Sequence, residues 1–79
     1  MESVLFVATR GSEDPVLATF PYDLAVGASR AGYRSAVALL GEAVLTVRPD
    51  VVEVIEGAGL PPLRELLREV RDFGIPVYV

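Results

Sequence analysis

Three short apolar runs, separated by glycine and proline, predict the arrangement of this chain. Residues 4–8 are all apolar, and an unbroken run of this kind is typical of a strand buried on both faces. Such strands belong to parallel sheets that helices cover on both sides. Residues 34–40, which are apolar from Ala36 onward, and residues 75–79 are interpreted as the second and third strands. The pattern predicts an α/β domain.

A helix is predicted between the first two strands. Asp14 and Pro15 are typical of an N-cap followed by the first helical position, where the missing N–H of proline costs nothing. Over 16–31 the apolar residues recur near the helical period, and Gly32 ends the helix. Pro21 predicts a kink or a restart near Phe20, because proline removes one backbone hydrogen bond. The periodic positions are Leu17, Phe20, Leu24, Ala28 and Ala31.

The second half of the chain contains the clearest helix signal. Residues 43–47 predict a short helix that ends at Pro49, 50–55 fit either a strand or a turn, and Gly57 and Gly59 mark a loop. A second long helix is expected over 61–73, since its apolar residues form one stripe and its charged residues the opposite face, before Gly74. The stripe consists of Leu63, Leu66, Leu67, Val70 and Phe73.

These elements predict one domain over 1–79 with a three-layer, flavodoxin-like fold. The strand–helix–strand unit of the first 40 residues requires a right-handed crossover. A change of direction after the second strand would place the third strand on the other side of the first. We therefore expect a parallel sheet of order 2-1-3, with the first helix on one face and the second on the other.

Composition narrows the classes of function. The net charge is −4 with a pI near 4.6, and the seven basic residues, all arginine, are scattered. A nucleic-acid partner is therefore not expected, because phosphate binding needs clustered positive charge. No apolar run approaches the roughly 20 residues of a membrane span, so we expect no membrane partner and a cytoplasmic location. The hydrophobic content of 52% indicates surface that is buried against other chains.

The chain has few groups that could carry chemistry. Cysteine, histidine and lysine are absent, which removes the thiolate nucleophile, the commonest metal ligand and base, and the Schiff-base amine. We predict no cofactor, no metal and no catalytic residue. Glu42 could act as a general acid or base only if burial raised the pKa of its carboxyl group. An acidic residue at the start of a helix is more often found there because the helix dipole favours negative charge at that end.

Ligands of parallel sheets gather at the carboxyl ends of the strands, and this rim holds the candidate binding residues. Backbone N–H groups at the first helix, with Arg10, could hold a small anion. The alternative is that Gly11 and Ser12 only form a turn and that Arg10 pairs with Glu13 or Glu42. The candidates are Thr9, Arg10, Gly11, Ser12, Gly41 and Glu42.

Taken in order along the chain, these features resemble the DsrE/DsrF-like family of sulfur-relay proteins. The resemblance begins with the apolar first strand, Glu13, Asp14 and Pro15, and the alanine-rich helix with Pro21 and Gly32. It continues with Gly41, Glu42, Ala43, Val44 and Leu45 after the second strand, and then with Leu60, Pro62, Leu63, Glu65 and Leu66. It ends with Gly74, Ile75, Pro76, Val77, Tyr78 and Val79.

The resemblance implies a flavodoxin-like sheet and assembly into homo-oligomers or hetero-oligomers. In members that transfer sulfur, it also implies a persulfide-carrying cysteine just after the strand that matches 75–79. This sequence ends at Val79, so that cysteine has no counterpart, and Ala43 replaces a glycine of the family's turn. Either the chain is a member that does not carry sulfur, or it lacks a C-terminal portion.

Two classes of function follow. The first is a small DsrE-like or small-molecule-binding subunit, such as an anion or nucleotide module, whose partner chain or ligand supplies the chemistry. The second is a purely structural, oligomer-forming domain. In both classes we expect self-association, with other sulfur-relay subunits as further partners. The expected interface includes the third strand or the small-residue face of the first helix, because an open apolar strand edge is rarely left in water.

Overall fold

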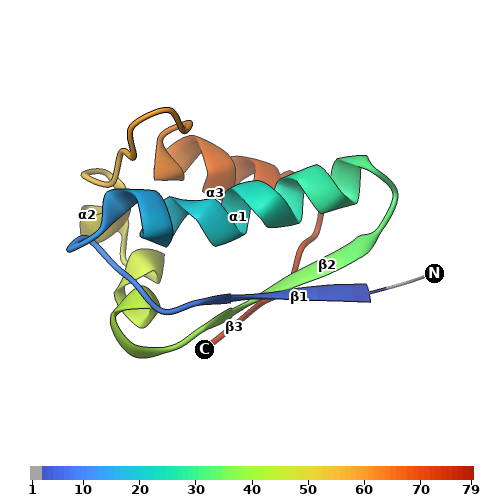
Figure 1. The fold of residues 1–79 in the computed structure, drawn as a ribbon, viewed down its shortest axis with the longest axis horizontal. Helices are drawn as coiled ribbons and strands as arrows, with labels where there is room; N and C mark the ends of the chain where they lie inside the picture. Colours follow the sequence, from blue (N-terminus) through green and yellow to red (C-terminus); the bar gives the residue numbers. More distant parts are fainter. Residues whose placement is uncertain (1–2) are drawn as a thin grey trace.

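The computed structural model describes residues 3–79 and shows a three-stranded parallel sheet with helices packed against it (Figure 1). The strands are β1 (Ser3–Ala8), β2 (Arg34–Leu39) and the short β3 (Val77–Tyr78). The helices are α1 (Pro15–Arg30), the 3-10 helix η1 (Gly41–Val47), the single turn α2 (Pro49–Val52) and α3 (Leu63–Asp72). The predicted α/β class with a parallel sheet is confirmed.

Most of the predicted elements are found within a few residues of their expected bounds. Asp14 caps α1 through its carboxylate, which accepts a hydrogen bond of 3.1 Å from the N–H of Leu17, and Pro15 is the first helical residue. The helix is continuous through Pro21, so the predicted restart near Phe20 does not occur. Residues 50–55 contain the turn α2 rather than a strand, and the third strand covers only two of the five predicted residues.

The strand order differs from the prediction. The order is β1-β2-β3, so β2 is central, whereas the predicted order 2-1-3 placed β1 in the centre. Both steps across the sheet run in the same direction, and right-handed crossovers then place the connecting helices on the same face. In agreement, α1 and α3 contact each other and lie together on one side of the sheet (Figure 1). The expectation of helices on opposite faces, in three layers, is therefore wrong for these residues.

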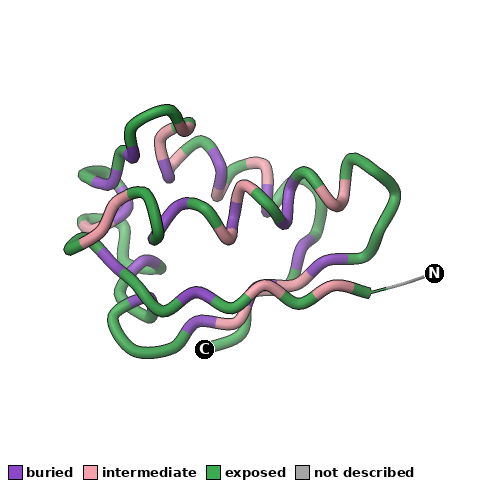
Figure 2. The backbone as a smooth tube through the Cα atoms, in the orientation of Figure 1, coloured by how far each residue is buried: buried purple, intermediate pink, exposed green. Residues whose placement is uncertain are grey.

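The core lies between the sheet and the two long helices. Purple segments in Figure 2 mark these buried positions on the inner sides of α1 and α3 and along β2. The predicted stripe of α3 is confirmed at three of its members, which are fully buried, whereas Phe73 is exposed and lies 5.8 Å below the Arg30 guanidinium. The core residues include Ala18, Tyr22, Ala25, Val26, Val37, Leu39, Ile55, Leu63, Leu66 and Val70.

Helix α1 buries a different face from the one predicted. Ala18, Tyr22, Ala25 and Val26 are in the core, whereas Leu17, Phe20 and Leu24 of the predicted stripe remain more than two-fifths exposed. The helix therefore has two apolar sides, of which one is buried and the other stays partly exposed. The core side combines Ala18 and Ala25 with the larger Tyr22 and Val26, and it packs on both the sheet and α3.

Within residues 3–79, helices cover only one face of the sheet. Alternate residues of a strand point to opposite faces, and Val4, Phe6, Ala8, Ser35, Val37 and Leu39 point toward the helices. The opposite face carries apolar side chains that are at least half exposed: Leu5 (58%), Val7 (50%), Leu40 (56%) and Tyr78 (59%). We call these four residues, with the half-buried Ala36 and Ala38 between them, the open sheet face. The predicted burial of the first strand on both faces is therefore wrong within this chain.

Tyr22 is the one core tyrosine, and its hydroxyl lies inside the protein. The Thr46 hydroxyl donates to the Ala43 carbonyl at 2.6 Å, so the Tyr22 hydroxyl donates to Thr46 Oγ1, 2.8 Å away. Burial raises the pKa of Tyr22 above its ordinary value of 10.0. The folded protein therefore holds the phenol proton more tightly than the unfolded chain does.

We expect the stability of the fold to depend on Tyr22 at alkaline pH. Above about pH 10 the unfolded chain releases the phenol proton while the folded chain keeps it, so the free energy of unfolding falls as the pH rises. Tyr22→Phe removes this proton and should flatten the decline. Urea unfolding of both chains at neutral and alkaline pH measures the difference. An equally steep decline in the variant would contradict this account of Tyr22.

Candidate functional site

The structure brings the two predicted halves of the candidate site together at the carboxyl rim of the sheet. The Leu40 N–H donates to the Ala8 carbonyl at 2.9 Å, which holds the loop after β2 beside the loop after β1. Gly11 is buried, and a Cβ added to it would lie 2.6 Å from the Glu42 carbonyl oxygen. Gly41 turns the chain here with a φ of 57°. Only glycine adopts this left-handed conformation without strain.

Two carboxylates of the same loop accept backbone N–H groups, one in the first turn of α1 and one in the loop before it. The Gly11 N–H donates to Glu13 Oε1, and the Asp14 carboxylate accepts from Leu17. The Asp14 N–H in turn donates to the Gly11 carbonyl at 3.1 Å. These side chains take the place that an external anion would need, and their negative charges would repel it. The structure therefore agrees with the interpretation of Gly11 and Ser12 as a turn.

The first turn of α1 is also covered by a loop from the second half of the chain. Gly57 is buried, and a Cβ there would lie 2.9 Å from Cα and 3.2 Å from N of Val16 and 3.1 Å from the Pro15 carbonyl oxygen. The backbone of Gly57 thus rests directly on the helix start. The sequence marked Gly57 only as part of a loop, because nothing local to it indicates the helix against which it packs.

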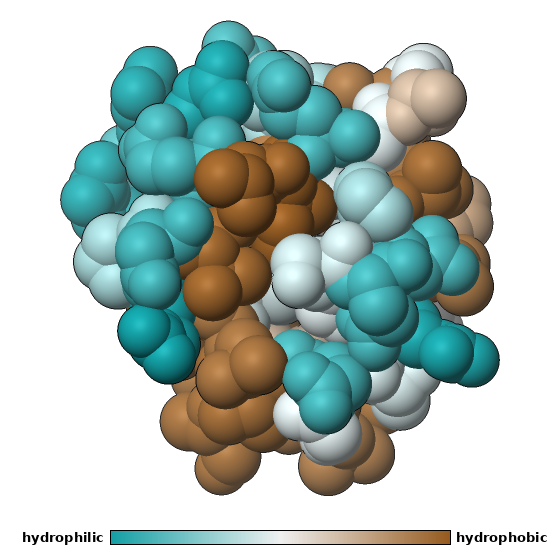
Figure 3. Space-filling model, turned by 90° about the vertical axis from the view of Figure 1, so that its left-hand side faces the viewer, coloured by the Kyte–Doolittle hydropathy of each residue, from teal (hydrophilic) through white to brown (hydrophobic). Residues whose placement is uncertain are grey.

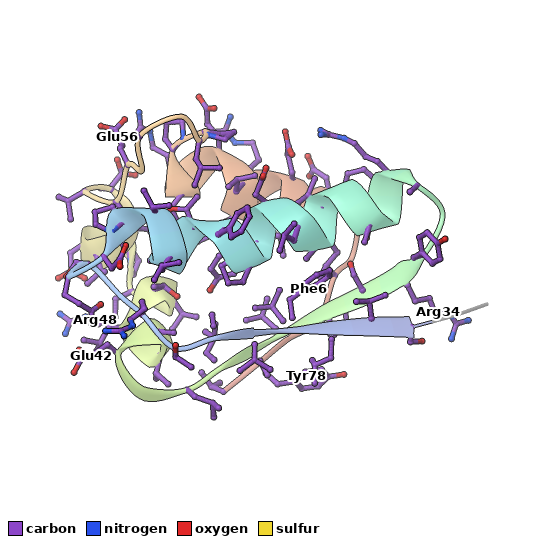
Figure 4. All side chains as sticks on the ribbon, in the orientation of Figure 1. Phe6, Arg34, Glu42, Arg48, Glu56 and Tyr78 are labelled. Carbon is purple, nitrogen blue, oxygen red and sulfur yellow. The ribbon has the colours of Figure 1, made fainter. Side chains whose placement is uncertain are left out.

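Arg10 and Glu42 are exposed at this rim, as are Thr9 and Ser12. Among residues 3–79, neither Arg10 nor Glu42 belongs to an ion pair, so the predicted pairing of Arg10 with Glu13 or Glu42 is wrong. Glu42 lies at the end of the sheet and points away from the strands (Figure 4). An exposed carboxylate of this kind lacks the burial that would turn it into a general acid.

Two hollows lie near the sheet, and neither gathers chemically reactive groups. One of about 250 Å³ runs between the edge of β1 and the outer side of α1, where Arg10 meets Leu17, Phe20 and Leu24. The other, of about 650 Å³, lies at the opposite end of the sheet, beside Arg34, Phe73 and Tyr78. Among the described residues, acidic side chains form no cluster of three that could hold a metal ion.

The strand order explains why the loops after β1 and β2 pack against each other at this rim, which we call the closed rim. Ligand crevices in open α/β sheets form where the strand order reverses and neighbouring connections diverge to opposite faces. The order β1-β2-β3 has no reversal, so the loops after β1 and β2 leave toward the same face and pack on each other. The sequence correctly predicted which residues share the rim, but the crevice was inferred from an order that the structure does not have.

Comparisons with known proteins add no assignment: no family model, no curated protein and no solved structure matches this chain. In the described part of the chain, no helix has the length and apolar character needed to cross a membrane.

Proposed function

We propose that this chain is a DsrE-like subunit whose own role is assembly: it presents an apolar sheet face to another chain and supplies no catalytic group. One observation carries the proposal. The four large apolar residues of the open sheet face, Leu5, Val7, Leu40 and Tyr78, are all at least half exposed on the same side of one sheet. Contiguous apolar patches of this kind mark interaction surfaces in proteins.

The apolar surface is not limited to one strand. Figure 3 views the end of the molecule that contains η1 and α2, and hydrophobic residues extend from the middle of this view to its lower part. Covering even ~400 Å² of apolar surface per chain contributes on the order of 10 kcal/mol at about 25 cal/mol per Å². Association costs roughly 4–15 kcal/mol, so the burial of this face between two chains can offset that cost.

The assembly role also accounts for the strand sequences. The open face is apolar because, in this proposal, another chain covers it and supplies the layer that this chain lacks on that side of the sheet. Such a partner would be a second copy or another sulfur-relay subunit in the cytoplasm. A persulfide-carrying cysteine would come from outside the 79 residues, since the sequence contains none.

The closed rim supports assembly over a module that binds anions or nucleotides. Asp14 accepts the N–H of Leu17 in the first turn of α1, Glu13 accepts the N–H of Gly11 in the loop before it, and Gly57 covers the start of the helix. Thr9 and Arg10 both line the hollow of about 250 Å³, whose other lining residues are apolar, and Ser12 and Glu42 are exposed and do not line it. In this proposal the role of the rim is structural: its contacts hold the loops after β1 and β2 together at the end of the sheet.

Sedimentation velocity over a wide range of protein concentration tests the proposal. We expect the mass to rise from one chain at high dilution to two or more chains at high concentration, with unchanged circular dichroism. A folded chain that keeps the mass of a single copy at every concentration would contradict the assembly role.

A further inference from the structure

We infer that the occupant of the open sheet face is a second copy of this chain, stacked face to face about a two-fold axis that crosses the strands at Val7 and Ala38. The inference rests on the proposed assembly role and adds the partner and its orientation. Two sheets that pack face to face lie about 10 Å apart with closely aligned strands. A two-fold interface uses the same patch on both copies, so the patch must complement itself.

Charge at the two ends of the face provides this complementarity. Arg34 begins β2 on the open side, because its neighbour Ser35 points toward the helices. Glu42 follows Leu40 beyond the other end of the same strand, and Figure 4 shows Arg34 and Glu42 at opposite ends of the sheet. Within residues 3–79, Arg34 and Glu42 belong to no ion pair. Glu42 lies just past the left-handed turn at Gly41 rather than in the strand, and the axis at Ala38 brings the Arg34 end of β2 in each copy opposite the Glu42 end in the other.

The shape of the face is compatible with the same axis. Ala36 and Ala38 are small and central, and Leu40 stands beyond them on the same side of β2. Rotation about Ala38 brings Leu40 of one copy over Ala36 of the other, so a large side chain meets a small one. Tyr78 is paired with Ala38 in the sheet and lies below the strands in Figure 4. It therefore meets its own counterpart near the axis, and aromatic residues of this kind are frequent anchors of interfaces.

The size of the face sets the expected strength. β1 and β2 have six residues each and β3 has two. At about 3.3 Å per residue and about 4.8 Å between strands, the face covers roughly 220 Å² in projection. A standard stable interface buries about 800 Å² per partner. The stacked dimer should therefore dissociate on dilution. Even weak interactions between the charges at the ends of the face should then change its dissociation constant measurably.

Charge reversal at the two ends tests the orientation by sedimentation velocity on the full chain. Arg34→Glu and Glu42→Arg each place like charges opposite one another twice in the dimer, and we expect each to raise the dissociation constant about tenfold. The double variant restores opposite charges and should return to within about threefold of the original chain. Matched controls are Arg68→Glu and Glu53→Arg, which make the same charge changes at exposed positions elsewhere; we expect them to leave the dissociation constant within about twofold.

The outcomes separate this inference from the assembly role. If the chain associates but the single reversals behave like their controls, or the double variant does not recover, the two-fold stacking is wrong while assembly stands. In that case a loss of mass in Leu24→Gln, on the outer side of α1, would place the interface beside the edge of β1 instead. If the original chain keeps the mass of one copy throughout, both the stacking and the assembly role are wrong.

Discussion

Val7→Asp should abolish association and leave the folded chain largely intact. The Val7 side chain is half exposed on the open sheet face, and the proposed axis brings the two copies of this residue together. A carboxylate there would face its own counterpart in an apolar contact, and an unpaired charge is costly to bury. We expect the dissociation constant to rise more than about a hundredfold, equivalent to about 2.7 kcal/mol. Sedimentation velocity measures this change.

The single chain should tolerate the same substitution, because position 7 already faces water in it. The loss of strand propensity costs at most about 1 kcal/mol in the free energy of unfolding. Val54→Asp is the matched control, since Val54 is 70% exposed in the loop after α2 and lies outside the open sheet face. It should leave association unchanged. Equal dissociation constants for the two variants would exclude the sheet face as the interface.

Gly11→Ala should destabilise the fold by about 1–3 kcal/mol, the usual cost of adding a methyl group to a close contact. A Cβ at this position would lie 2.6 Å from the Glu42 carbonyl oxygen, so one of the two rim loops must move. That displacement would strain the bonds that hold the loops, including the one from Leu40 to Ala8. Urea unfolding measures the loss in the free energy of unfolding. A structural role of the rim requires that this loss is found.

Gly27→Ala provides the matched control for this prediction. Gly27 lies inside α1, is exposed, and has no atom within 4 Å of an added Cβ. Alanine there should stabilise the fold by about 0.5–1 kcal/mol, because glycine loses more conformational freedom in a helix. Opposite signs for the two glycines are expected. If Gly11→Ala is as stable as the original chain, the two loops are not in the close contact described.

The sequence predicted the elements well because their signals are local. The Asp14 and Pro15 pair marks the start of α1, and the stripe of Leu63, Leu66 and Val70 lies on the buried side of α3. The rim residues were also grouped correctly, since parallel strands end at the same edge. What is encoded in short stretches of chain, such as the bounds of α1 and α3, agrees with the structure, whereas the third strand is shorter than predicted and no restart occurs at Pro21.

The strand order and the buried face of α1 could not be derived in this way. A right-handed crossover fixes the hand of each step but not its direction, so orders 2-1-3 and 1-2-3 satisfy the same rule. Helix α1 is apolar on two sides, and periodicity alone does not decide between Leu17 and Tyr22 as core residues. Gly57 gave no signal because its contact with Val16 is remote in sequence and made through the backbone.

Nitration of the tyrosines as a function of protein concentration tests the central claim, that another chain covers the open sheet face, most directly. Tyr78 lies on this face and is 59% exposed, Tyr33 is 47% exposed outside it, and Tyr22 is fully buried. Mass spectrometry of the peptides compares the three in one sample. We expect Tyr78 to react readily at high dilution and to become protected as the chains associate, while Tyr33 stays reactive and Tyr22 unreactive. Equal reactivity of Tyr78 in the dissociated and the associated protein would contradict the account.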